Sequence, residues 1–175
     1  MSSTPSNADI TGEESDIVEM WMHIDKTRWV AGAMAGIFAG LVMMGVAMVF
    51  SVVGGMEFWF PVKFVAVPFL GASAMEYGMQ MGAIVTGLVF HFLLSIVLGM
   101  IYAHFTITNK FWPLMGAGFT WGTFSWIFMN NLFIQAFRDI SAIHVSKGAA
   151  FFVDLAFGFS LVSVAMFDRM LRGKN

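Results

Sequence analysis

Long uninterrupted apolar runs dominate the pattern of hydrophobic and polar positions along the chain. A helix needs about 20 consecutive apolar residues to cross about 30 Å of hydrocarbon, because it rises about 1.5 Å per residue. Four runs reach that length, over residues 30–53, 81–104, 111–133 and 148–167. The sequence therefore predicts an all-α integral membrane protein with a bundle of four transmembrane helices.

The polar residues before the first run predict two short segments ahead of the membrane domain, which covers residues 30–175. Residues 1–19 are acidic and rich in Ser, so they cannot bury enough apolar surface to fold and should form a disordered tail. Residues 20–29 form an interfacial lead-in, with Lys26 and Arg28 expected at the lipid headgroups. A secretory signal peptide would begin with basic residues and a shorter apolar run, so the first run is interpreted as an uncleaved span.

The connection between the first two runs is unusual. Residues 58–71 are too apolar for an ordinary aqueous loop and too few to cross the membrane, and Pro61, Lys63 and Pro68 interrupt them. The stretch is predicted to be either an interfacial segment at headgroup depth or a re-entrant segment whose backbone the helices satisfy.

The basic residues near the span ends predict the orientation of the chain. With four spans, one face carries both termini and the second connection. Six basic residues lie on that face: Lys26, Arg28, Lys110, Arg169, Arg172 and Lys174. Three lie on the other face: Lys63, Arg138 and Lys147. Because cytoplasmic segments carry the excess of Lys and Arg, both termini are expected in the cytoplasm.

Composition narrows the classes of function. Charged residues make up 11% of the 175 residues, against about 25% in soluble domains. The net charge of −2 does not indicate nucleic acid as a partner. The chain has no Cys, which excludes disulfides, thiolate metal sites and Cys nucleophiles. No Ser stands in a nucleophile-elbow motif either, so the sequence predicts that the protein is not an enzyme.

Glycines recur at every fourth position in two of the runs. Gly32, Gly36 and Gly40 lie in the first run, and Gly118 and Gly122 lie in the third. A stripe of small residues lets another helix backbone approach closely. The approaching helix could belong to the same chain, to a second copy or to another subunit, and the sequence leaves these alternatives open.

The same spacing suggests an internal repeat. In the second run His91 and Ser95 precede Gly99 at four-residue steps, and in the fourth run Asp154 precedes Gly158. Each half of the chain would then hold a glycine-striped helix followed by a helix with a polar and a small residue. Both halves start from the same face, so the axis relating them would lie along the membrane normal.

Asp154 is the most costly residue to place in a membrane, because a carboxylate within a span needs a partner, a proton or water. His91 enters from the same face, and the depths of the two residues differ by only about 6 Å. Asn130 and Asn131 close the third run on that face. The four side chains are predicted to form one intramembrane polar cluster. It could be a proton site, a contact for a quinone or lipid headgroup, or a hydrogen-bonded knot that joins helices.

No cofactor and no metal site is predicted. Haem b is the alternative, but His91 and His104 are about 13 residues apart on one run, which turns the second about 140° from the first. Paired Met residues such as Met43 and Met44 could bind Cu(I). No His or Cys accompanies a repeated Met motif, however, and Met more often fills irregular space in a core.

The order of three features resembles that of small bacterial four-helix membrane proteins. The features are the glycine-striped first run, the segment from Pro61-Val62-Lys63-Phe64 to Leu70-Gly71, and Gly87-Leu88-Val89-Phe90-His91. The resemblance implies a protein of the bacterial inner (plasma) membrane. It brings no assigned activity, so no residue role follows from it.

Three functions are compatible with these observations. The small size, the glycine stripes and the lack of catalytic sets favour a non-catalytic accessory or structural subunit. It would bind other membrane subunits, as in a respiratory or energy-transducing complex, or itself in a homo-oligomer. The second function is a small transporter or proton-conducting protein that uses Asp154 and His91, and the third is a carrier of haem or quinone. The lipid bilayer surrounds the chain in each case.

Overall fold

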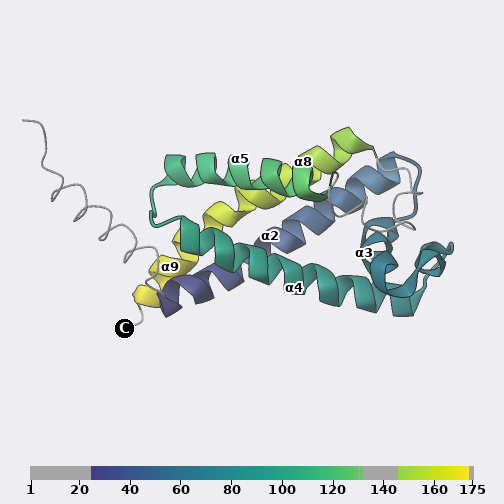
Figure 1. Cartoon of the computed structure of the whole chain (residues 1–175), viewed down its shortest axis with the longest axis horizontal. Helices are drawn as coiled ribbons and strands as arrows, with labels where there is room; N and C mark the ends of the chain where they lie inside the picture. The colour runs from purple at the N-terminus through teal and green to yellow at the C-terminus, as the bar shows by residue number, and fades with distance from the viewer. Residues whose placement is uncertain (1–24, 130, 132–145, 174–175) are drawn as a thin grey trace, which may run out of the picture.

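The apolar runs of the sequence form long helices, drawn in Figure 1. The computed structural model describes residues 25–129, 131 and 146–173. The predicted tail, the first half of the lead-in (residues 20–24) and residues 130, 132 and 133 of the third run lie outside these residues. In chain order the elements are α2 (Lys26–Val53), α3 (Phe60–Leu70), the 3-10 helix η1 (Ala72–Met75), α4 (Met81–Phe105), α5 (Phe111–Phe128), α8 (Lys147–Ser160), the 3-10 turn η3 (Leu161–Ser163) and α9 (Val164–Arg172).

Within the described residues, three helices are long and apolar enough to cross a membrane: Lys26–Val53, Met81–Phe105 and Lys147–Arg172, the last of which joins α8, η3 and α9. The prediction of a helical chain with membrane-compatible helices is thereby confirmed. The third predicted run forms α5, which is described over 18 residues and contains Pro113 near its start. It does not qualify as a candidate span, so the count of four spans stays a prediction.

The unusual connection forms α3, an apolar helix of 11 residues that is too short to cross a membrane. Pro61 occupies its first turn, where a missing N–H leaves no hydrogen bond unmade. The helix ends at Gly71, whose φ of 70° favours glycine. A Cβ on Gly87 of α4 would lie 2.0 Å from the Val62 carbonyl oxygen, so the two backbones touch there. α3 is thus held against α4, while an interfacial or re-entrant depth stays a prediction.

The first glycine stripe packs α2 against α4 in an antiparallel pair. A Cβ added to Gly32 would lie 2.6 Å from the carbonyl oxygen of Gly99, and one added to Gly36 would lie 2.2 Å from that of Ser95. A Cβ on Gly40 would lie 2.7 Å from the Ser95 hydroxyl oxygen. Real Cβ atoms do not approach other atoms so closely, so the glycines are what allow the helices to meet.

The second stripe packs α5 against α8 in the same way. A Cβ on Gly118 would lie 2.5 Å from the carbonyl oxygen of Gly158, and one on Gly122 would lie 2.7 Å from that of Asp154. In each pair the stripe contacts a glycine of the other helix and the residue four positions before that glycine. The same arrangement in both halves of the chain is what the predicted internal repeat would produce. All five predicted stripe glycines therefore contact helices of their own chain.

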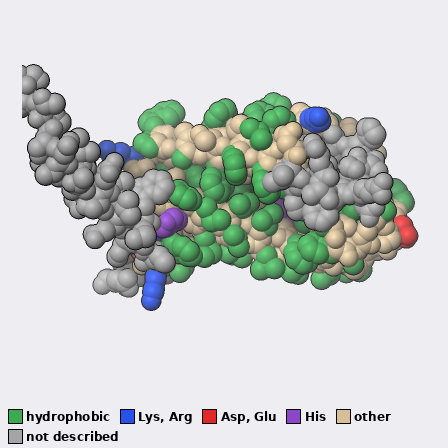
Figure 2. Space-filling view, in the orientation of Figure 1, with side chains coloured by type: hydrophobic (Ala, Val, Ile, Leu, Met, Phe, Trp, Pro, Cys, Tyr) green, Lys and Arg blue, Asp and Glu red, His purple; other side chains and the backbone are tan. Residues whose placement is uncertain are grey.

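α2 joins the two pairs, because it packs on α8 and α9 as well as on α4 (Figure 1). In Figure 2, hydrophobic side chains cover the middle of the molecule and charged side chains lie toward its two ends. Large apolar side chains are exposed on every long helix, as at Val49, Leu93, Phe124 and Phe152. Such a surface would be costly in water but suits lipid chains, so the structure is compatible with a membrane location.

Candidate functional site

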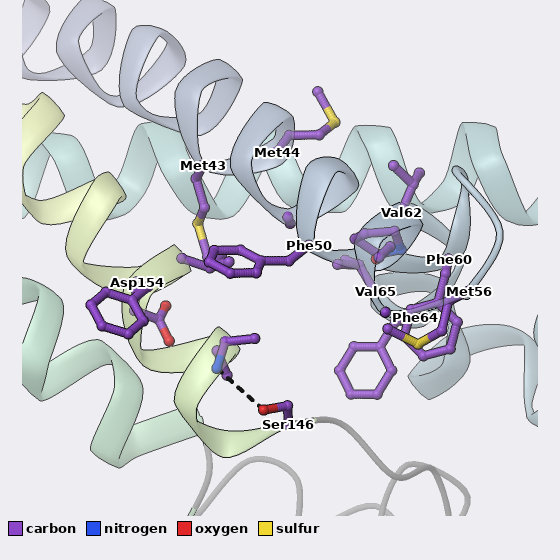
Figure 3. Close-up of a pocket in the computed structure, with 18 of the residues that line it drawn as sticks. Met43, Met44, Phe50, Met56, Phe60, Val62, Phe64, Val65, Ser146 and Asp154 are labelled. Atoms are coloured by element: carbon purple, nitrogen blue, oxygen red, sulfur yellow. Dashed lines mark hydrogen bonds between the residues drawn. The ribbon is translucent and has the colours of Figure 1, made fainter.

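A cavity of about 760 Å³ lies between α2, α3 and the first turns of α8 (Figure 3). Apolar side chains make up most of its walls. Those labelled in Figure 3 include Met43, Met44, Phe50, Phe60 and Phe64. Among the described residues that line it, His91 and Asp154 carry the titratable groups. The structure thus brings the two central residues of the predicted polar cluster to one cavity.

Asp154 reaches the cavity because of how α8 begins and packs. The Ser146 hydroxyl caps the helix by accepting a hydrogen bond from the Ala149 N–H at 3.4 Å, about two turns before Asp154. On the other side of α8, the close approach of Gly122 holds the helix backbone against α5. The Asp154 side chain is therefore directed away from α5, and Figure 3 shows its carboxylate pointing into the cavity.

The Asp154 carboxylate has no partner within the described part of the chain. The residue is only 6% exposed, yet no side chain or N–H of the described residues donates a hydrogen bond to its carboxylate, and no ion pair reaches it. A carboxylate in such a place is stable only with a proton, a cation or water beside it. Because no described residue meets this requirement, Asp154 is the candidate functional group of the cavity.

His91 is held by a hydrogen bond between helices. Its Nε2 lies 2.9 Å from the carbonyl oxygen of Gly40, and because a carbonyl can only accept, Nε2 carries the proton and donates it. The half-buried imidazole therefore links α4 to α2 at the wall of the cavity. No hydrogen bond between His91 and Asp154 occurs in the structure as described, so they share a space without forming a direct pair.

Of the two asparagines in the predicted cluster, the structure describes one. Asn130 lies outside the described residues. The exposed Asn131 uses its side-chain amide to donate a hydrogen bond to the Ile127 carbonyl oxygen at 3.0 Å, within its own helix, and it does not line the cavity.

The sequence did not reveal that Lys63 and Glu57 fix the wall formed by α3. Lys63 is fully buried, forms an ion pair with Glu57, and donates hydrogen bonds to the carbonyl oxygens of Glu76 at 2.6 Å and Gly78 at 3.2 Å. The Glu57 carboxylate also accepts the Gly78 N–H at 3.0 Å. Burial alone would raise the pKa of Glu57, but the bonds from Lys63 and Gly78 and the charge of Lys63 hold this pKa below its usual 4.5.

At the opposite end of the bundle, Arg28 forms a second polar centre. Arg28 is only 8% exposed, so its charge is satisfied by the protein itself, and its place at the lipid headgroups stays a prediction. Its guanidinium donates to the carbonyl oxygens of Ala103 at 3.3 Å, of Thr106, and of Thr108 at 2.9 Å, at the end of α4. It also forms an ion pair with Asp168 at 3.5 Å. Five donors in a planar fork can satisfy these acceptors together.

The histidines and methionines considered for cofactors are also placed by the structure. His104 lies at the end of α4 remote from the cavity, where its Nδ1 accepts a hydrogen bond from the Trp29 indole at 3.4 Å. It therefore does not share a site with His91. Met43, Met44, Met56 and Met129 line the same cavity as His91. No group of three or more His, Asp or Glu side chains able to hold a metal occurs in residues 25–129, 131 and 146–173.

Comparison of the chain with protein-family models, with curated proteins and with solved structures finds no match. The function must therefore be argued from the geometry of the cavity.

Proposed function

We propose that the chain is a small, non-catalytic membrane transporter or proton-conducting protein that works through the cavity beside Asp154. The observation that carries the proposal is the Asp154 carboxylate, 6% exposed and without a partner among the described residues, on the wall of a cavity of about 760 Å³. A polar cluster that served only to join helices would have hydrogen-bond partners for its polar groups, because an unpaired carboxylate within the membrane costs several kcal/mol.

Asp154 can bind and release a proton or exchange it for another ligand as the cavity fills and empties. His91 would act as a positioning residue, because its bond to Gly40 ties α4 to α2 at the wall of the cavity. Any shift between these helices would break or remake that bond. Transport and conduction both require such a group to face water or ligand in turn, and Asp154 already faces an open space.

The proposal is tested in inverted bacterial vesicles that contain the protein and maintain a respiratory pH gradient. The gradient is followed with a fluorescent amine while cationic, anionic and neutral solutes are added in turn. Collapse without solute indicates proton conduction, and collapse on addition of a solute indicates coupled transport. Asp154→Asn should abolish either signal, whereas Met166→Leu, on the exposed part of the same long helix, should preserve it. A gradient unaffected by the protein under all conditions would overturn the proposal.

An accessory or structural subunit is the second candidate, and α5 supports it. This helix is not among the candidate spans, and large aromatic side chains are exposed along it, as at Trp112 and Phe124. Gly116 on its exposed side has open space around it, and Thr120 follows one turn later. A partner helix could dock there, since the other glycines of α5 already contact α8. Gly116→Ile should then change the mass or composition of the complex extracted in mild detergent, whereas an unchanged complex would exclude this face as the interface.

A further inference from the structure

We infer that the ligand of the cavity is a lipophilic organic cation, which exchanges with the proton of Asp154. This inference rests on the proposed transport function and specifies its substrate class. The volume of about 760 Å³ lies within the range of about 300–1,000 Å³ that accommodates drug-sized molecules. The mostly apolar walls select a ligand with a large apolar body.

The charge of the ligand follows from what surrounds Asp154. No Lys or Arg is among the described residues that line the cavity. Lys63 of the neighbouring α3 is fully buried and its ammonium is occupied by Glu57 and by two carbonyl oxygens. Arg28 lies at the opposite end of the bundle, paired with Asp168. Lys147 lies between the lining residues Ser146 and Gly148 but does not itself line the cavity. Among the described residues, then, none supplies the positive charge that would stabilise the Asp154 carboxylate, which leaves a place for a cationic ligand or a proton.

The side chains of the walls also favour a cationic ligand over a neutral ligand with a similar apolar body. Phe50, Phe60 and Phe64 line the cavity, and the negative faces of aromatic rings attract a cation by about 2 kcal/mol or more when water is excluded. Met43 and Met44 supply flexible, polarisable side chains that adapt to ligands of different shape. An anionic ligand would meet the Asp154 carboxylate and these ring faces unfavourably.

The exchange balances in charge without a further reactant. With the cavity empty, Asp154 carries a proton on one carboxyl oxygen. When a monovalent cation enters, that proton leaves to water and the carboxylate pairs with the cation, so one proton is released for each cation bound. His91 of α4 is the other titratable group among the described residues that line the cavity, while those of α2 and α3 contribute none. Loss of the Asp154 proton therefore controls binding.

Tetraphenylphosphonium and tetraphenylborate test the inference, because they share nearly one shape and carry opposite charges. Binding to the full-length protein in detergent is measured by equilibrium dialysis. Tetraphenylphosphonium should bind, with an affinity that rises up to tenfold per pH unit while Asp154 is protonated, and release about one proton per cation in unbuffered solution. Tetraphenylborate should bind at least tenfold more weakly.

Three variants decide the role of the carboxylate. Asp154→Asn should lose the proton release and the pH dependence, Asp154→Glu should retain both, and Met166→Leu should match the unaltered protein. Equal binding of the two ions, or pH-dependent binding that survives in Asp154→Asn, would overturn the inference. So would displacement of the probe by phosphatidylethanolamine at equimolar amounts, since the cavity would then hold a lipid ammonium.

Failure of this inference is distinguishable from failure of the proposed function. If the vesicle assay shows Asp154-dependent collapse with anionic or neutral solutes, or with none, transport or conduction stands and the cationic substrate class falls. If neither assay responds to Asp154→Asn while the variant folds normally, both fall.

Discussion

Gly158 of α8 lies so close to Gly118 of α5 that a Cβ on Gly158 would stand 2.1 Å from the Gly118 carbonyl oxygen. The other helix pair repeats the relationship, with a Cβ on Gly99 at 2.4 Å from the Gly32 carbonyl oxygen. Because apolar side chains gain little by leaving lipid for one another, membrane helices associate through such close backbone packing. The glycines therefore hold together the two pairs that carry Asp154 and His91.

Adding a methyl group at these contacts should destabilise the bundle. Gly158→Ala and Gly99→Ala should each cost about 1–3 kcal/mol, because overpacking forces the helices apart. Gly45→Ala and Gly116→Ala are the matched controls, since both sites have open space and Ala favours a helix by up to about 1 kcal/mol over Gly. Melting temperatures in detergent measure the difference. The packing argument fails if the two kinds of variant melt alike.

Arg28 should be irreplaceable by Lys. The Arg28 guanidinium donates hydrogen bonds to the carbonyl oxygens at the end of α4 and lies 3.5 Å from the Asp168 carboxylate. The single ammonium of a lysine at this position could not reach all of these acceptors. Arg28→Lys or Arg28→Met leaves Asp168, which is 1% exposed, with less compensation, so a loss of about 3–5 kcal/mol is expected. Lys26→Met, on an exposed site two residues away, should change stability by less than about 0.5 kcal/mol. Urea unfolding in mixed micelles provides the comparison.

The ion pair between Lys63 and Glu57 should show strong coupling. Glu57→Gln leaves a fully buried ammonium without a countercharge, which costs about 3–5 kcal/mol, whereas Lys63→Met combined with Glu57→Gln removes both charges. The double variant should therefore be more stable than Glu57→Gln alone. Additive losses in this double-mutant cycle would show that the pair does not hold α3 in place.

The same pair predicts how stability depends on pH. The pKa of Glu57 is lower in the folded protein than its ordinary 4.5, so its contribution is fully present above about pH 4.5 and is lost as pH falls through the folded value. Unfolding between pH 3 and pH 6 should show this loss at the acidic end. Because Gln does not titrate, Glu57→Gln should flatten the curve in that window. An unchanged slope would mean that other carboxylates account for acid sensitivity.

The long apolar runs alone determined the helical, membrane-compatible character of the chain. In lipid each backbone N–H and C=O must be satisfied locally, so an apolar run of sufficient length has the helix as its stable form. The four-residue glycine spacing likewise indicated close helix contacts, because it depends only on the helical period. The carboxylate of Asp154 stood out by its cost in lipid, again without reference to any neighbour.

Which residues meet was decided only by the tertiary structure. Arg28 bonds carbonyl oxygens some 75 to 80 positions away, and the glycine stripes could have faced another subunit until α4 and α8 were seen to occupy them. The cavity has no signature of its own in the sequence, because its walls come from α2, α3, α4 and α8, which are separate in the chain. Helix formation depends on local hydrogen bonds and hydropathy, whereas partners and empty space depend on where helices cross, and only packing in three dimensions sets those crossings.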